Sequence, residues 1–276
     1  MVSVQNLTKY FYKRNTRITA LSDISFDVAR GGFVSIVGPS GCGKSTILDL
    51  IVGMARPSAG AIRYDGRRVE GIAVGIGYLT QHDTLLSWRS VEDNVRLPLD
   101  VQARGLARLL GRRTDPEARE RVAWAIKLVG LSDFEHHLPG ELSGGMRKRA
   151  AMAQTLVYAR ETVLMDEPFG ALDFQMRLQM QAELAQLWST ERRTIVFVTH
   201  DIEEAIALSD QVIVLRRRPG RIRDIVAIDL PRPRDPVTIR FTPRFQELYQ
   251  RIWSQLDPPE GAPQRSGPTL APGVRG

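Results

Sequence analysis

The chain has 276 residues, of which 43% are hydrophobic and 25% charged, so its length and composition allow one large α/β domain with a soluble surface. Its formal net charge of +7 invites a nucleic-acid hypothesis, but the basic clusters at 104–121 and 216–223 lack interleaved aromatic residues for base stacking, and we expect a solvated basic face and no nucleic-acid partner. We expect neither a membrane-spanning helix nor a signal peptide, because no apolar run approaches the roughly 18 residues that such a helix needs and the N-terminus lacks a basic region followed by an apolar core.

Two segments near the N-terminus predict strands. Residues 2–12 alternate weakly between apolar and polar residues and predict an edge strand, whereas residues 20–28 alternate more clearly. Three aromatic residues, Tyr10, Phe11 and Tyr12, lie at the end of the first predicted strand, before the second begins. One of these rings could stack on a nucleotide base, although an aromatic residue on a strand more often belongs to a core.

The clearest motif is a glycine-rich loop that follows a predicted apolar strand at 33–37 and precedes a predicted helix at 46–54. It fits the phosphate-binding pattern G-x-x-x-x-G-K-[ST], and its members are Gly38, Pro39, Ser40, Gly41, Cys42, Gly43, Lys44, Ser45 and Thr46. Main-chain N–H groups and the positive end of the following helix would hold phosphate oxygens. Lys44 should reach the β- and γ-phosphates, and the Ser45 hydroxyl should ligate Mg²⁺. The loop therefore predicts binding of a nucleoside triphosphate, while Cys42, the only cysteine, fits a reducing compartment.

The middle of the chain changes from strand to helix. A predicted strand at 74–79 delivers Gln81 to a loop, where its amide oxygen could ligate Mg²⁺ or position a water molecule, or the residue could simply be exposed. Residues 90–159 are rich in arginine and leucine at helical spacing and predict a helical insertion into the sheet domain. The last helix of this insertion follows a sequence that would make either an anion site or an ordinary N-cap, formed by Ser143, Gly144 and Gly145.

Two later strands end in polar residues. The predicted strand at 162–166 ends in Asp166 and is followed by Glu167, and the predicted strand at 194–199 is followed by His200. The carboxyl ends of parallel strands are where ligands bind in open α/β sheets. Asp166 therefore suits a Mg²⁺ contact, Glu167 could polarise a water molecule, and His200 should reach the same edge of the sheet.

The C-terminal part differs in composition. Residues 243–256 place Phe245, Leu248 and Ile252 at helical spacing and predict an amphipathic helix, whereas residues 257–276 are rich in proline and glycine, and we expect disorder there. The predicted organisation is one domain over 1–232, with the helical insertion at about 90–159, and a C-terminal extension over 233–276.

Taken together, the motifs resemble those of the nucleotide-binding subunit of ATP-binding-cassette (ABC) transporters, over roughly residues 1–230. The resemblance implies an α/β fold, with a P-loop NTPase (RecA-like) core sheet, an N-terminal antiparallel β subdomain and a helical ABC-specific subdomain. Its motifs would be the Walker A loop at 38–46, the Q-loop at Gln81, the signature at 142–145, Walker B at 164–167, the D-loop at 171–173 and the switch histidine at His200. One departure is Met146, which stands where the family signature commonly has glutamine, so any role of that glutamine side chain is in doubt.

The resemblance also implies roles for these residues in an ATPase that uses ATP and Mg²⁺. Lys44, Glu167 and His200 would be catalytic, Ser45, Gln81 and Asp166 would serve the metal, and Phe11, with Tyr12 as the next choice, would stack on adenine. The remaining site residues would complete the nucleotide site of a second copy in a homodimer: Ser143, Gly144, Gly145 and Asp173.

Longer strings at 81–88, 142–147, 166–173 and 199–205 resemble ABC importers for nitrate, sulfonate or taurine. That group uses separate membrane permease subunits and, indirectly, a solute-binding protein, so we expect a peripheral location at the cytoplasmic face of the inner membrane. The alternative is a soluble ABC ATPase in DNA repair or translation, a class that usually carries tandem cassettes or long coiled-coil insertions, neither of which this sequence predicts.

Overall fold

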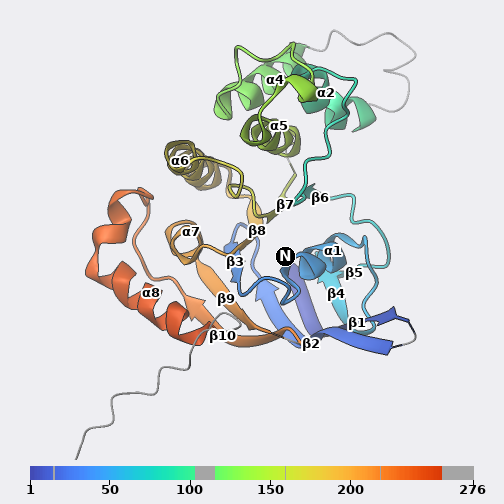
Figure 1. The fold of residues 1–276 in the computed structure, drawn as a ribbon, viewed down its shortest axis with the longest axis vertical. Helices are drawn as coiled ribbons and strands as arrows, with labels where there is room; N and C mark the ends of the chain where they lie inside the picture. The colour runs from blue at the N-terminus through green and yellow to red at the C-terminus, as the bar shows by residue number, and fades with distance from the viewer. Residues whose placement is uncertain (15, 103–115, 159, 218, 257–276) are drawn as a thin grey trace, which may run out of the picture.

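The computed structural model describes residues 1–14, 16–102, 116–158, 160–217 and 219–256, which form two sheets and a group of helices (Figure 1). The disorder predicted at 257–276 and most of the basic cluster at 104–121 lie outside these ranges. Every helix within them is too short or too polar to cross a bilayer.

The N-terminal segments build an antiparallel sheet in the order β2-β1-β4-β5. Its strands are β1 (Val2–Lys13), β2 (Thr16–Val28), β4 (Ala59–Tyr64) and β5 (Arg67–Arg68). The prediction that the first strand lies at an edge is wrong, because β1 pairs with β2 on one side and with β4 on the other. The second pairing sets Val2 opposite Tyr64, a long-range contact that local alternation cannot reveal.

The second sheet has six strands in the order β10-β9-β3-β8-β7-β6. They are β3 (Phe33–Val37), β6 (Ile76–Leu79), β7 (Thr162–Asp166), β8 (Thr194–Thr199), β9 (Gln211–Arg216) and β10 (Arg221–Ala227). All neighbours are parallel except β10, which runs antiparallel to β9. Every residue of β3, β7 and β8 is buried, as expected for parallel strands whose two faces are both covered, and this explains their unbroken apolar sequences.

Helices cover this sheet and extend it. Those that follow core strands are α1 (Lys44–Val52), α6 (Phe174–Glu191) and α7 (Ile202–Leu208). Between β6 and β7 the chain inserts the helical subdomain, at the upper end of Figure 1, with α2 (Val91–Gln102), α4 (Pro116–Leu128), the short helix η1 (Pro139–Glu141) and α5 (Gly144–Leu156). Side chains of α5 and of β7 belong to one hydrophobic cluster, so this subdomain shares a core with the sheet.

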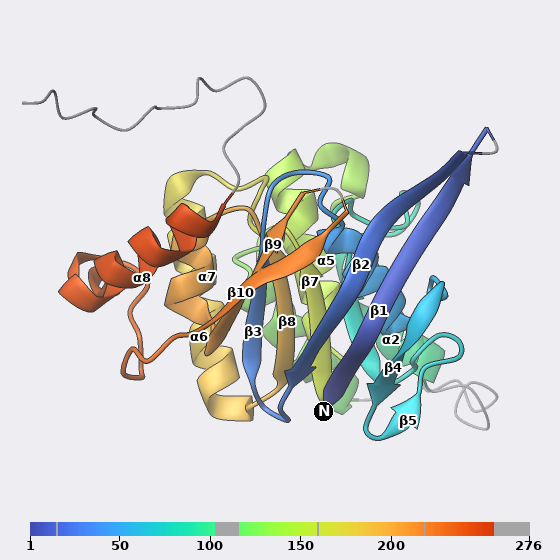
Figure 2. The ribbon, with the colours of Figure 1, turned by 90° about the horizontal axis from the view of Figure 1, so that it is seen from below.

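The C-terminal segment packs on the opposite side of the sheet domain from the antiparallel sheet (Figure 2). It contains η2 (Thr238–Phe241) and α8 (Pro243–Gln255), and α8 buries Phe245, Leu248 and Ile252 in a cluster with residues of α7. Arg234 is 7% exposed and donates hydrogen bonds to four backbone carbonyl oxygens, those of Ile206, Ser209, Ile228 and Leu230. The hydrogen bonds of this one buried guanidinium group thus hold the C-terminal segment against the end of α7.

Candidate active site

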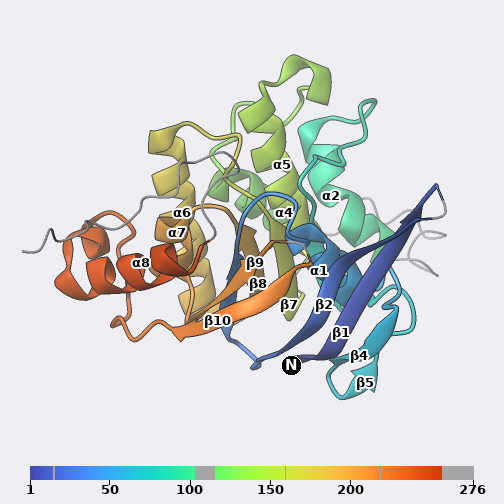
Figure 3. The same cartoon turned by 60° about the horizontal axis from the view of Figure 1, so that its bottom comes forward.

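The register of the parallel sheet brings the predicted site residues that follow its strands to one edge. Val37 lies opposite Thr199, Asp166 opposite Val198, and Leu79 opposite Met165. The loop after β3, the Asp166–Glu167 pair, His200 and Gln81 therefore all follow strand ends on the same side of the sheet. Figure 3 shows β7 and β8 side by side, with α1 next to them.

The glycine-rich loop joins β3 to α1 in a conformation that depends on glycine. Gly43 has a φ of 100°, and a Cβ atom at this position would lie 2.5 Å from Cδ2 of Leu21 on β2. The loop is therefore pressed against the antiparallel sheet, and α1 begins directly at Lys44 with no side-chain cap. The uncapped N–H groups and the positive end of the helix dipole favour an anion at this position.

Lys44 adds a positive charge to this loop. Its side chain is buried, with 7% exposure, and Nζ donates hydrogen bonds to the carbonyl oxygens of Gly38, at 2.7 Å, and Pro39, at 3.3 Å. These acceptors carry no negative charge, so they do not compete with an anion held by the loop. Phosphate oxygens fit this donor set.

Ser45 and Asp166 form the part of the site that suits a metal ion. Asp166 is 2% exposed; burial raises the pKa of this carboxyl group, and a hydrogen bond with Ser45 acts in the opposite direction. In the described ranges no group of three His, Cys, Asp or Glu side chains could hold a metal on its own. A hydroxyl and one carboxylate beside a phosphate-binding loop fit Mg²⁺, which proteins bind through one or two carboxylates together with substrate phosphates.

Glu167 and His200 lie in contact at the strand ends. Nδ1 of His200 is 3.4 Å from Oε1 of Glu167. The side chain of His200 is 64% exposed and that of Glu167 is 24% exposed. Glu167 adopts a left-handed backbone conformation with a φ of 46°, which is uncommon for a residue other than glycine, asparagine or aspartate. Strained backbone of this kind concentrates at functional sites, so the observation makes Glu167 a candidate for chemistry.

Thr199 and Glu204 form hydrogen bonds that hold the turn at His200 in place, a role that the sequence alone did not predict. The hydroxyl of Thr199 donates to Oε2 of Glu204 at 2.7 Å and accepts from the backbone N–H of Asp201 at 3.0 Å. Glu204 is 4% exposed, and burial raises its pKa from 4.5 to about 7. A buried carboxyl group on the helix after His200 was visible only as one of two adjacent glutamates.

Gln81 is exposed just beyond the end of β6, at the same edge as Asp166. Its backbone carbonyl accepts a hydrogen bond from the buried ammonium of Lys148 on α5, at 2.9 Å. We did not predict a role for Lys148 from the sequence. The sequence contained one indication of such a role. Lys148 lies three and four residues before Ala151 and Met152, which places a lysine on an apolar face of the helix.

The Ser-Gly-Gly sequence forms the exposed N-terminus of α5. Ser143 caps the helix, because its hydroxyl oxygen accepts a hydrogen bond from the N–H of Met146 at 3.2 Å, and both Ser143 and Gly144 are exposed. In Figure 1, α5 lies with the helical subdomain and α1 lies beside the antiparallel sheet. The structure therefore does not bring this sequence together with the phosphate-binding loop of its own chain.

The segment predicted as the D-loop, residues 171–173, lies against the same helix end. A Cβ atom at Gly145 would lie 3.1 Å from the carbonyl oxygen of Ala171, so a side chain here would have to push that carbonyl away by a few tenths of an ångström. Asp173 caps α6 by accepting a hydrogen bond from the N–H of Met176 at 3.0 Å, and it is exposed. Ser143, Gly144 and Asp173 are thus exposed, Gly145 is half-buried, and the two segments predicted as signature and D-loop lie next to each other.

Phe11 lies on β1 near the phosphate-binding loop. It is paired with Ile18 of β2, three residues along from the Leu21 that touches Gly43, which corresponds to about 10 Å along the strand. Its ring is 47% exposed and has Nζ of Lys9 at 5.1 Å from the centroid, whereas Tyr12 is 72% exposed. The exposed fraction of Phe11 is compatible with stacking on a base.

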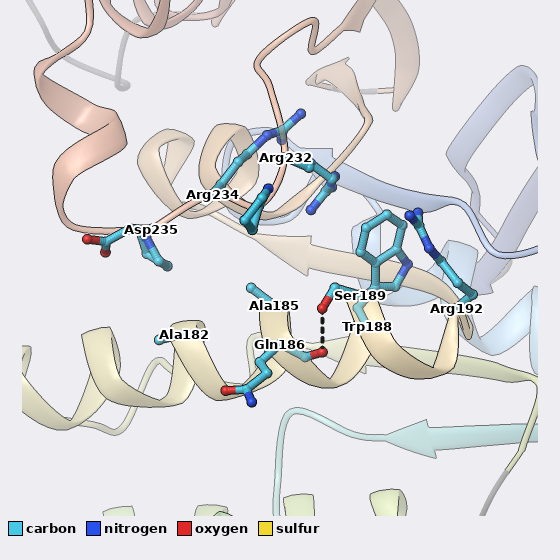
Figure 4. Close-up of a pocket in the computed structure, with 11 residues that line it drawn as sticks. Ala182, Ala185, Gln186, Trp188, Ser189, Arg192, Arg232, Arg234 and Asp235 are labelled. Atoms are coloured by element: carbon cyan, nitrogen blue, oxygen red, sulfur yellow. Dashed lines mark hydrogen bonds between the residues drawn. The ribbon is translucent and has the colours of Figure 1, made fainter.

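A separate cavity of about 610 Å³ lies between α6 and residues 232–236 and contains none of the predicted site residues (Figure 4). Trp188 lines it, with the guanidinium carbon of Arg232 at 3.9 Å and that of Arg192 at 4.6 Å from the indole ring. Trp188 also packs on Phe33, the first residue of β3. The cavity is therefore at the amino ends of the strands, away from the edge that carries the candidate active site.

Comparison with known proteins identifies the family. A family model described as ABC transporter matches residues 21–170, more than half of the chain. An uncharacterised ABC transporter ATP-binding protein of Methanocaldococcus jannaschii is 44% identical over 243 residues, which cover 87% of this chain and 86% of the relative. The aliphatic sulfonates import ATP-binding protein SsuB of Bacillus cereus is 35% identical over 256 residues, 93% of this chain and 96% of the relative.

A solved structure agrees with this result. The chain superimposes with a TM-score of 0.75 and 29% identity on the ATP-binding cassette MJ0796, solved as a dimer in a post-hydrolysis state with ADP and phosphate, covering 84% of this chain and all of that one. The match confirms the predicted α/β P-loop fold with its antiparallel and helical subdomains. The chain belongs to the ABC transporter family and is one of its ATP-binding subunits, an ATPase that powers transport.

Proposed function

We propose that the chain is the ATP-hydrolysing subunit of an importer for a small anionic or zwitterionic solute of the nitrate, sulfonate or taurine group. The observation that carries the proposal is the contact between Glu167 and His200, 3.4 Å apart, at the sheet edge shared with the phosphate-binding loop. The solute class rests on the Bacillus cereus relative, whose name assigns it to import of aliphatic sulfonates. Relatives named as transporter proteins also favour transport over DNA repair or translation.

In the proposed reaction, Glu167 accepts a proton from a water molecule as that water attacks the γ-phosphorus of ATP, and ADP leaves as the bond to the β-phosphate oxygen breaks. His200 orients the water and stabilises charge on the γ-phosphate, and Lys44 neutralises phosphate charge from within the loop. Such electrostatic groups are each typically worth about 10²–10³-fold in rate. Phe11 would hold the adenine by stacking.

Ser45, Asp166 and Gln81 are the residues that would hold Mg²⁺. The ion would neutralise negative charge on the phosphates of the bound nucleotide. The chain's own contribution is to keep a hydroxyl and a buried carboxylate side by side behind the phosphate-binding loop.

A second copy of the chain completes each site in this proposal. Ser143, Gly144 and Asp173 are exposed and Gly145 is half-buried beside them, on a patch that does not face their own phosphate-binding loop. Two chains related by a two-fold axis would place each patch on the other's ATP. The dimeric state of MJ0796, at 29% identity, supports this arrangement.

The partner on the membrane side would be a pair of permease subunits, served indirectly by a solute-binding protein, with this chain held at the cytoplasmic face of the inner membrane. The loop that begins at Gln81 and leads into α2 contains Trp88, which is 73% exposed. An exposed indole in the loop that carries a proposed metal ligand suits contact with the permease.

The substitution Glu167→Gln tests the proposed function. The amide keeps the size of the side chain but cannot take the proton, so we expect ATP hydrolysis to fall by about 10²–10⁴-fold while ATP affinity is retained. The variant should form an ATP-dependent dimer, measured by size-exclusion chromatography. Lys44→Ala is the control, since it should lose nucleotide affinity itself. A monomeric and fully active Glu167→Gln variant would contradict the proposal.

A further inference from the structure

Lys148 is a buried lysine whose partners are all backbone carbonyl oxygens. Lys148 is 5% exposed. Its Nζ atom donates hydrogen bonds to the backbone carbonyl oxygens of Thr80 at 2.8 Å, Gln81 at 2.9 Å and Asp166 at 3.4 Å. Two of these acceptors belong to the residues proposed to ligate Mg²⁺. The ammonium therefore lies behind the metal site and joins the end of β6 to the end of β7.

The cost of burying this charge argues for more than packing. The side chain of Lys148 is buried, and the carboxylates of Asp166, Glu167 and Asp83 lie close enough to interact with its positive charge. A buried ammonium loses its hydration and must recover it through hydrogen bonds, and here three carbonyl oxygens provide them. An apolar side chain at this face would avoid the desolvation cost but would leave these carbonyl oxygens without their donor.

The third element joined by Lys148 is α5 itself. Ser143 caps this helix, and Lys148 lies about one and a half turns further along it, so the two residues move together with the helix. A second link supports the first: Nε of Arg147 is 3.3 Å from Oδ2 of Asp83, in the loop that follows Gln81. Through α5, the chain's own metal ligands are connected to the Ser-Gly-Gly patch that it presents outwards.

We propose that Lys148 is a positioning residue that couples the two nucleotide sites of a dimer. When ATP binds to the chain's own phosphate-binding loop, the segments that contain Gln81 and Asp166 take up a fixed position. Lys148 transmits this position to α5. Because α5 begins at the Ser143–Gly145 patch, the position of the patch that contacts the second copy changes with it. The inference rests on the proposed function, because it requires the patch to act in a dimer. It adds a residue that touches neither substrate nor metal.

The main test is Lys148→Met, which keeps the length of the side chain and removes its charge and donors. In a Glu167→Gln background, we expect binding of a fluorescent ATP analogue to one copy to stay unchanged, while ATP-driven dimerisation weakens roughly 5- to 150-fold, the range of typical coupling between sites. With Glu167 intact, the Hill coefficient for ATP should fall towards one. Lys148→Arg, which keeps charge and donors, should recover part of the dimerisation.

A matched control is Lys127→Met, which removes an exposed lysine from α4 of the same subdomain and should change neither property. Normal ATP-driven dimerisation of Lys148→Met would overturn the inference. So would an equal loss of ATP binding and dimerisation, or a failure of Lys148→Arg to recover anything, because both would indicate a purely structural role. If Lys148→Met does not fold, as judged by circular dichroism, Lys148→Gln takes its place with the same expected split.

Failure of the proposed function is distinguishable from failure of this inference. In that case the Glu167→Gln parent would bind the ATP analogue but would form no ATP-dependent dimer, whatever residue stands at position 148.

Discussion

Replacing Glu204 by glutamine tests how a buried charge behind His200 affects folding stability. The carboxyl group is 4% exposed and accepts hydrogen bonds from Thr199, at 2.7 Å, and from Nε2 of Gln181, at 3.2 Å. Glutamine has the same shape; its amide oxygen can accept the bond from Gln181, and its N–H can donate to the hydroxyl of Thr199. The substitution therefore removes the ionisable group and retains the packing.

The sign and size of the effect follow from the pKa. Burial raises the pKa of Glu204 from 4.5 to about 7, so between these pH values the folded chain holds a proton that the unfolded chain has released. The free energy of unfolding therefore falls as pH rises through this window. The loss of folding stability caused by the buried carboxylate is absent below pH 4.5 and complete above pH 7. At about 1.4 kcal/mol per pKa unit, it amounts to a loss on the order of 3 kcal/mol.

Urea unfolding of the wild type and of Glu204→Gln, at about pH 5 and about pH 8, measures this effect. We expect the variant to gain stability relative to the wild type by on the order of 3 kcal/mol between the two conditions. Glu203→Gln is the control, since this neighbour has a 42% exposed side chain paired with Arg240 and should bring no gain at high pH. A stability difference between wild type and Glu204→Gln that is the same at both pH values would refute the reasoning.

Two further predictions concern the surfaces that meet partners. Ser143→Arg places a bulky charge on the exposed cap of α5, so we expect ATP binding to one copy to stay nearly intact and phosphate release to fall at least about 100-fold; normal turnover would count against a shared site. Trp88→Ala removes an indole that is 73% exposed, and we expect solute uptake by cells carrying the transporter to fail while basal ATPase activity of the purified chain persists; loss of both would argue against a coupling role.

The convergence of the candidate site could be predicted from the sequence because its strands are short apolar runs with polar residues at their ends. Strands such as β7 and β8 are buried on both faces, so their sequences carry no alternation and mark a parallel sheet. In a parallel sheet the strand ends meet at one edge, which is why Asp166 and His200 could be placed together before their contact partners were known.

Other features depended on long-range contacts that a local pattern does not carry. The inner position of β1 follows from its pairing with β4, and β10 escaped prediction because charged residues interrupt its apolar ones and only Val226 is buried. Lys148 and Glu204 are ionisable residues whose burial depends on carbonyl, hydroxyl and amide partners from other elements. Helical spacing indicates which face a residue occupies but not which polar groups lie opposite it.

The strand order of the larger sheet has a consequence for synthesis of the chain. The neighbours of β3 on both sides, β8 and β9, begin about 160 residues or more after β3 itself, whereas β1, β2 and β4 are all complete by Tyr64. At roughly 5–20 residues per second, β3 and the loop attached to it wait on the order of ten seconds for their partners to leave the ribosome. During that interval the small antiparallel sheet can close, while both edges of β3 stay open to chaperones or to a neighbouring nascent chain.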